Sequence, residues 1–245
     1  MQKVDILAIG VHPDDVELSC SGTLLRHLKM GKTVGLLDLT RGELGTRGNA
    51  DIRDREAAEA ARLMGAAFRI NLGMPDGFIT YSEENILKIV QVIRQCQPDI
   101  VLTNALSDRH PDHGKSAILT ADACFYAGLV KITTTDEAGK TQDRWRPGAV
   151  YHYIQDRNLR PDFVVDISPY IEEKIALVRT FRSQFNLPDN PEEYREELST
   201  PISGQDFINY LYAKARAYGR DAGFEYAEAF NVTRTLGVLN LFDLS

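Results

Sequence analysis

Short apolar runs typical of buried strands alternate with helix-like segments along most of this chain. The runs with this strand-like character span residues 4–10, 33–39, 68–72, 99–103, 150–154 and 163–167. A parallel strand needs a crossover connection, usually a helix, so this alternation predicts a mostly parallel sheet with helices on both faces. No repeat or composition shift divides the 245 residues, and one domain over 1–245 is expected.

Several helix-like segments carry signals at their ends. Asp51 is expected to cap a helix over 52–64, and Ser82 to begin one that runs to Gln95. Leucines from Leu18 to Leu28 predict one helix after the first strand. Further helices are expected over 116–126, 169–181 and 205–218, and an irregular connection over 186–203. The polar stretch 133–146 lacks periodicity, which predicts a long surface loop and a candidate lid.

Two clusters of histidine and aspartate follow two of the expected strands. His12-Pro13-Asp14-Asp15 comes after the run 4–10, and His110-Pro111-Asp112-His113 after the run 99–103. Ligands of parallel α/β sheets bind at the carboxyl ends of the strands. A catalytic zinc ion usually takes three protein ligands of these types and leaves one position open. The two clusters together therefore predict a single metal site.

Each cluster alone is weak evidence, because histidine and aspartate are common at turns and helix caps. The pairing of two clusters is what favours a metal site. The other histidines are expected to lie at the surface (His27) and in a structural position (His152). The three cysteines show no CxxC spacing, so we expect buried, reduced thiols rather than ligands or disulfides; they are Cys20, Cys96 and Cys124.

The net charge and the hydropathy of the chain limit the kinds of molecule that it is expected to bind. The net charge of −7 argues against nucleic acid and anionic membranes, although a few arginines can still bind a small anion. No apolar run approaches a membrane span and no signal segment is recognisable, which predicts a cytoplasmic protein. The first strand is followed by Gly10-Val11-His12-Pro13 and not by GxGxxG, which disfavours a nucleotide- or sugar-binding module.

Four segments resemble the LmbE/PIG-L family of zinc-dependent N-deacetylases: HPDDVELSCSGTL, TRGELGTRG, GMPDG and RHPDH. The resemblance continues to GFEYAEAF near the C-terminus, and is greatest to the deacetylases of bacillithiol biosynthesis, which act on N-acetylglucosaminyl malate. It implies a Rossmann-like α/β fold, one zinc ion per chain and, by analogy, a homo-oligomer such as a hexamer. Iron, cobalt or manganese also suit such ligands.

The resemblance also implies roles for the clustered residues. His12, Asp15 and His113 would ligate the metal, Asp14 would be the general base, and His110 the acid or the stabiliser of the oxyanion. Asp112 is expected to orient His110.

Substrate contacts are implied in the same way. Arg53 and Asp76 would hold sugar hydroxyls, and Ser19 would lie near the acetyl group. Arg109, next to His110, is expected to clamp a carboxylate, because guanidinium and carboxylate pair bidentately. A salt bridge within its own helix, to Asp54 or Glu56, is the alternative for Arg53, and a plain turn residue the alternative for Asp76. Three further charged residues either rim the site or are only solvated: Arg41, Glu43 and Arg47.

The expected activity is hydrolysis of the acetamide of an N-acetylglucosaminide, with N-acetylglucosaminyl malate as the favoured substrate. Other N-acetylated amino sugars are the enzymatic alternative, including free N-acetylglucosamine, a chitin fragment or an antibiotic precursor. In either case the partner is a small molecule.

Overall fold

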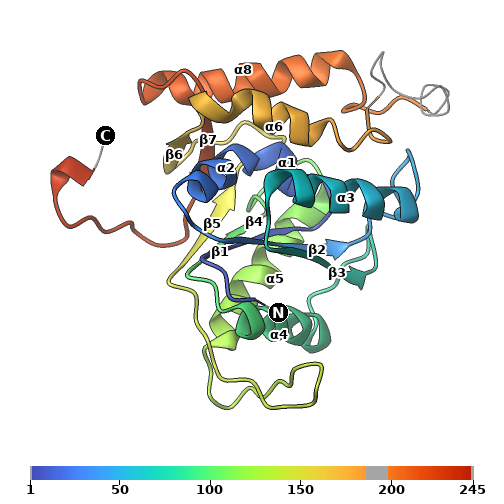
Figure 1. Ribbon diagram of the computed structural model, residues 1–245, viewed down its shortest axis with the longest axis vertical. Coiled ribbons are helices and arrows are strands. Elements are labelled where there is room, and N and C mark those ends of the chain that lie inside the picture. The colour runs from blue at the N-terminus through green and yellow to red at the C-terminus, as the bar shows by residue number, and fades with distance from the viewer. Residues whose placement is uncertain (1, 186–197, 244–245) are drawn as a thin grey trace.

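The computed structural model describes residues 2–185 and 198–243, which build a seven-stranded sheet in the order β3-β2-β1-β4-β5-β7-β6. The first five strands in this order run parallel, and β7 runs antiparallel to both β5 and β6 (Figure 1). The bounds are β1 Ile6–Gly10, β2 Val34–Thr40, β3 Phe68–Met74, β4 Ile100–Thr103, β5 Ala149–Tyr153, β6 Phe163–Asp166 and β7 Ala227–Asn231. The predicted mostly parallel sheet is confirmed, and each expected strand forms within two residues of its predicted bounds.

Helices cover both faces of the sheet, as expected (Figure 1). On one face lie α4 (Glu83–Cys96) and α5 (Pro111–Ala127). The other face carries four helices, with α8 (Gln205–Asp221) beside the last of them: α1 (Asp15–Ser19), α2 (Ser21–Lys29), α3 (Ala50–Met64) and α6 (Ile171–Val178). Short 3₁₀ turns form at η1 (Ser168–Tyr170) and η2 (Leu241–Asp243). A buried apolar cluster fills each side of the sheet, because the central strands are apolar on both faces.

The central strand β1 decides where a ligand can bind. It pairs with β2 on one side and β4 on the other, with Ile6 opposite Ile100 and Ala8 opposite Leu102. The strand order reverses at this point, and crevices form there outside the carboxyl ends of the strands. The two histidine clusters follow the carboxyl ends of β1 and β4 and therefore meet at the same edge of the sheet.

Several helix boundaries differ from the predictions. Asn49, and not Asp51, caps α3, because its backbone is extended and its side chain accepts the N–H of Ile52 at 3.0 Å. The helix expected over 116–126 already begins at Pro111, with His110 as its N-cap. The single helix expected after β1 is two, α1 and α2, which are separated at Cys20.

The C-terminal half differs more. The expected helix 169–181 is the turn η1 followed by the shorter α6. The strand β7 was not predicted. Of the expected irregular connection 186–203, residues 186–197 lie outside the described residues.

The loop 133–146 packs away from the carboxyl ends of the strands. Its Gln142 donates to the carbonyl of Gln91 on α4, and the indole of Trp145 donates to the carbonyl of Pro98, just before β4. None of its residues lines the cavity described below, so its interpretation as a lid is wrong.

The remaining expectations concern single residues and the membrane. All three cysteines are buried and free, as predicted. His152 is buried in β5 with Nδ1 2.9 Å from the carbonyl oxygen of Asn104, a structural position, and His27 is partly exposed on α2. Among the described residues, no helix combines the length and apolar character needed to cross a membrane.

Candidate metal and active site

The turn after β1 carries three of the predicted residues, His12, Asp14 and Asp15. The backbone N–H of Val11 donates to Oδ1 of Asn104 at 3.0 Å, which ties this turn to the end of β4. The N–H of His12 donates to Oδ2 of Asp15 at 2.9 Å. The turn is therefore closed on itself and held to the neighbouring strand.

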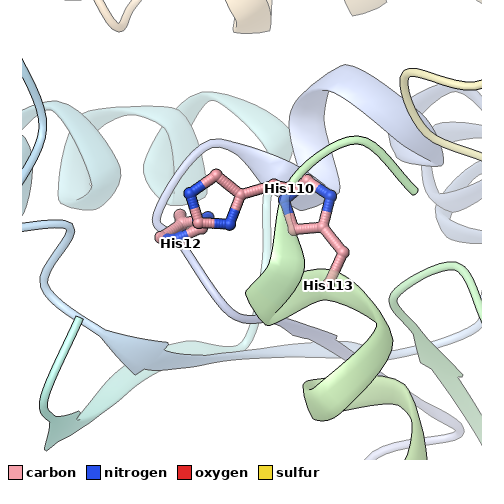
Figure 2. Close-up of side chains that lie close together, drawn as sticks. All are labelled: His12, His110 and His113. Carbon is pink, nitrogen blue, oxygen red and sulfur yellow. The ribbon is translucent and has the colours of Figure 1, made fainter. Parts of the chain in front are cut away.

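The start of α5 brings the second cluster against this turn. Figure 2 shows His110, the N-cap of α5, and His113 from the start of α5 close to His12 from the turn after β1. The ring centroids are 4.6 Å apart for His12 and His110, 5.5 Å for His12 and His113, and 5.1 Å for His110 and His113. One nitrogen of each ring lies within 4.8 Å of the others, a spacing that suits ligation of one ion.

Asp15 lies between two of these rings. One carboxylate oxygen is 3.7 Å from Nδ1 of His12, and the other is 3.2 Å from Nε2 of His113. Each oxygen also accepts an amide N–H at 2.9 Å, from Asn104 or from Gln155. These amides fix the orientation of the buried carboxylate.

His12 and His113 each carry a carboxylate on the nitrogen that faces away from Asp15. Asp76 Oδ1 is 3.0 Å from Nε2 of His12, and Asp108 Oδ2 is 2.5 Å from Nδ1 of His113. Metal-binding histidines characteristically have such a partner, which fixes the tautomer and the ring orientation.

His110 has a different environment. Its Nδ1 accepts the backbone N–H of Asp112 at 3.3 Å, which leaves Nε2 as the protonated nitrogen of the neutral ring. The carboxylate of Asp112 pairs with Lys115 through Oδ1, while Oδ2 is buried and has no hydrogen-bond partner among the described residues. Asp112 therefore contacts His110 through its backbone. Its carboxylate also forms a second group of potential ligands, with His12 and Asp76.

The ionisable side chains of the cluster shift one another's pKa values. Burial lowers the pKa of His12, but hydrogen bonds to Asp15 and Asp76 outweigh this and raise it to about 10. The pKa of His113 is lowered by burial and raised more by Asp15 and Asp108, to about 9. The pKa of His110 is lowered by burial and by the other two imidazoles. Asp15, between His12 and His113, thus favours positive charge at this point of the site.

Asp14 lies beside this cluster and pairs with Arg53. Nη2 of Arg53 donates to Oδ1 of Asp14 at 2.9 Å, and Nη1 donates to the carbonyl of Gly42 at 3.2 Å. The alternative of an ion pair with Asp54 or Glu56 does not occur. Among the described residues, Nε of Arg53 is buried without a partner.

A cavity of about 230 Å³ opens over these groups. Ser19, Asp76 and Arg109 line it, as do Tyr210, Leu211 and Lys214 from α8. Arg109 lies at its rim, with 53% of its side chain exposed and an ion pair to Asp156. Asp76 also accepts the N–H of Leu44 at 3.0 Å, so it does more than form a turn.

The three other charged residues of the glycine-rich loop have separate roles. Glu43 accepts the N–H of Asp76 and so supports the site from outside the cavity. Arg41 pairs with Asp51 and Asp54 near the start of α3. Arg47 is buried and donates to backbone carbonyls of residues 183 and 198. Neither arginine lines the cavity.

Comparison with known proteins agrees with this geometry. Residues 7–124, which include both histidine clusters, match the PIG-L family, described as GlcNAc-PI de-N-acetylase. The chain is 31% identical over 234 residues to a diacetylchitobiose deacetylase from Thermococcus kodakarensis, covering 91% of this chain and 80% of that protein. The chain belongs to the PIG-L family of N-deacetylases.

Two further proteins extend the PIG-L likeness over almost the whole chain. The structure of a conserved protein from Thermus thermophilus superposes with a TM-score of 0.82 at 35% identity, covering 96% of this chain and 98% of that one. A 1D-myo-inositol 2-acetamido-2-deoxy-alpha-D-glucopyranoside deacetylase from Rhodococcus erythropolis is 24% identical, covering 98% of this chain and 90% of that protein.

Three polar residues of this PIG-L site were not identified from the sequence: Asn104, Asp108 and Gln155. The first two lie between the strand 99–103 and His110, so their position in the chain was a usable signal. Gln155 follows β5 and reaches Asp15 only through the fold, and no local pattern marks it.

Proposed function

We propose that this chain hydrolyses the acetamide of an N-acetylglucosaminide. The observation that carries this proposal is a buried carboxylate, Asp14, beside a cluster of metal-ligating side chains in a small cavity. Membership of the PIG-L family and the named activities of its relatives, on diacetylchitobiose and on an inositol glycoside, support it.

We infer that His12, Asp15 and His113 hold one divalent ion, with zinc as the favoured metal. The donor set fits, because two imidazoles and a carboxylate face one another and the outer nitrogens of both imidazoles are bound by carboxylates. The second group, His12 with Asp76 and Asp112, fits less well, because it would use the His12 nitrogen that Asp76 already holds. When bound, the ion supplies a Lewis acid that polarises the acetamide carbonyl and acidifies water.

The chain's own residues then move protons. Asp14, fixed by Arg53, takes a proton from the water whose oxygen attacks the carbonyl carbon. His110 presents an Nε2–H that stabilises the developing negative charge on the carbonyl oxygen. As the C–N bond breaks, Asp14 returns its proton to the amine nitrogen, so acetate and the free amino sugar leave. The pKa of His110 is lowered by burial and by His12 and His113, against smaller opposing effects of Asp15 and Asp112, so the ring acts in its neutral form.

The specific N-acetylglucosaminide that we propose as the substrate is N-acetylglucosaminyl malate. Arg53, Asp76 and Ser19 are the proposed contacts of the sugar, and Arg109 at the rim is the proposed partner of a carboxylate. The alternative is a neutral chitin fragment, which the 31% identity to a diacetylchitobiose deacetylase favours.

Acetate release from a panel of substrates tests the activity: N-acetylglucosaminyl malate, N,N′-diacetylchitobiose and free N-acetylglucosamine. The expected result is metal-dependent release that is fastest with the malate glycoside and absent after chelation. Faster release from diacetylchitobiose would replace the malate assignment, and no release from any of the three would overturn the function.

We also propose a homo-oligomer, hexameric by family analogy, in a reducing compartment such as the cytoplasm. The segment after β7 extends from the body and carries large exposed apolar side chains, including Leu239 (99% exposed) and Phe242 (98% exposed) (Figure 1). The buried free cysteines support a reducing environment. Sedimentation of the full chain and of a Leu239→Ser/Phe242→Ser variant tests the assembly, and a monomeric wild type would refute it.

A further inference from the structure

Three cations line the cavity over the histidine cluster, and they differ in their partners. Arg53 pairs with Asp14, and Arg109 pairs with Asp156. Lys214 on α8 has no ion pair with any described residue, and its Nζ approaches the carbonyl oxygen of Ile154 at 3.5 Å. Of these three cations, Lys214 is thus the one without an ion pair among the described residues, although Asp108 and Asp156 lie near enough to raise its pKa.

The surroundings of Lys214 are aromatic and poorly hydrated. Its Nζ lies 5.8 Å from the ring centroid of Tyr210 and 6.0 Å from that of Tyr218. Burial lowers the pKa of Lys214 to about 8, with a smaller lowering by Lys174 and smaller opposing effects of Asp108 and Asp156. The ammonium group is still mainly protonated at neutral pH. An ammonium group held among aromatic rings gains more free energy from an anionic partner than a well-hydrated ammonium group does.

We propose that Lys214 binds a carboxylate on the aglycone of the substrate and so sets a preference for acidic N-acetylglucosaminides. This inference rests on the proposed deacetylase function. The reacting acetamide must lie against Asp14 and His110, so a residue of α8 in the same small cavity is left to face the remainder of the ligand. Malate carries two carboxylates, and a single ammonium group can pair with one of them.

The ion pairs within the cavity favour Lys214 over the two arginines as the partner of a substrate carboxylate. Four aspartates line the cavity, and each already lies beside a cationic side chain: Asp14 beside Arg53, Asp15 and Asp76 beside His12, and Asp156 beside Arg109. A substrate carboxylate therefore needs a cation that is free to receive it. Arg109 would have to give up its ion pair with Asp156 to do so. Lys214 breaks no ion pair.

The test compares two ligands that differ only in charge, N-acetylglucosaminyl malate and its neutral bis-amide. Variants Lys214→Met and Lys214→Arg are measured beside Arg109→Met. Lys88→Met is the matched control, because Lys88 lies on α4 on the opposite face of the sheet, paired with Glu84. Steady-state kinetics gives kcat/KM for both ligands, and thermal unfolding checks that each variant folds.

Lys214→Met is expected to lower kcat/KM for the malate glycoside by about 10- to 100-fold, the range of one charge-assisted hydrogen bond, with less than about a threefold change for the bis-amide. Lys214→Arg should keep most of the preference for the acid, and Lys88→Met should change neither value. An equal loss for both ligands would overturn the proposal, because it would indicate a packing role. The proposal would also be overturned if Arg109→Met lost the preference for the acid while Lys214→Met retained it.

Calorimetric binding of glucosaminyl malate and its bis-amide separates this inference from the deacetylase function. If the wild type releases no acetate from any glycoside, the proposed function fails. A Lys214-dependent preference for the acid in binding would then still support the anion site, and equal binding of acid and amide by the wild type would refute it.

Discussion

Arg53 donates a hydrogen bond from Nη2 to Oδ1 of Asp14 across 2.9 Å, and both side chains are almost completely buried. The same guanidinium donates to the carbonyl of Gly42, which joins the candidate base to the glycine-rich loop after β2. One carboxylate oxygen of Asp14 is therefore engaged, and in the proposed mechanism the other takes the proton from water. Removing one partner of such a buried pair leaves an uncompensated charge.

Asp14→Asn is expected to lower kcat by about 10²-fold or more while metal content stays at the wild-type level, because the amide preserves shape but cannot accept a proton. Acetate release and elemental analysis measure the two quantities. Asp54→Asn, which removes a partly exposed carboxylate paired with Arg41, is the control. A near-normal kcat in Asp14→Asn would exclude Asp14 as the base.

Gly42→Ala is expected to impair catalysis through Arg53. Gly42 has φ +64°, and a Cβ there would lie 1.9 Å from Nη1 of Arg53, so the guanidinium must move away from Asp14. Misplacement of this kind costs up to about 10²-fold in kcat. Gly31→Ala is the matched control, since Gly31 has φ +83° and nothing within 4 Å of the added carbon. Equal kcat in the two variants would contradict this prediction, because the carbon added in Gly31→Ala makes no contact with Arg53.

Alanine substitutions of the three histidines are expected to separate ligands from the acid. His12→Ala and His113→Ala should lose tight metal binding, because each removes one of three ligands. His110→Ala should retain the metal and lose kcat. Metal content after dialysis is the measurement. Loss of the metal in His110→Ala, with retention in His113→Ala, would exchange the roles of these two residues.

The carboxylates that contact the outer nitrogens of His12 and His113 test the same ligand assignment through smaller changes in metal affinity. Asp76→Asn and Asp108→Asn are expected to weaken metal affinity by about 10- to 100-fold without abolishing binding, because each keeps a hydrogen-bonding group but loses the charge that orients its imidazole. Competition with a chelator measures the affinity. Unchanged affinity in both variants would argue against the His12–Asp15–His113 assignment.

Local patterns predicted the strands and the two histidine clusters, because burial on both faces leaves continuous apolar runs and turn residues follow them. The strand β7 escaped prediction, since Ala227, Glu228 and Ala229 have little intrinsic strand preference. It forms because it pairs with β5 and β6. The carboxylate of Glu228 is stabilised in this strand by contacts with the start of α2 and with Lys174.

The site was predictable to the extent that its residues are neighbours in sequence. His12 and Asp15 lie three residues apart in one turn, and His110 and His113 three apart at one helix start. Gln155, just after β5, and Lys214 on α8 reach the same cavity from far along the chain, and only the tertiary fold brings them there. Asn49 replaced Asp51 as the cap of α3 because backbone conformation, and not residue type alone, selects a cap.

Metal affinity is expected to rise steeply with pH. The pKa of His12 is raised to about 10 and that of His113 to about 9 in the ion-free site, so at neutral pH both rings carry protons that a metal ion must displace. Affinity should therefore increase by up to about two decades per pH unit below pH 9 and level off above both pKa values. The same protons stabilise the ion-free protein below about pH 6.5, and this contribution is lost as pH rises through about 9 to 10.

Chelator competition at about pH 6.5, 7.5 and 8.5 measures this slope, and calorimetry in buffers of different ionisation enthalpy counts the released protons. Asp76→Asn is the control variant. It removes one of the interactions that raise the pKa of His12, so its slope should be shallower than that of the wild type. A wild-type affinity that does not change with pH would mean that His12 and His113 bind no proton in the ion-free site, contrary to the geometry of Asp15 between them.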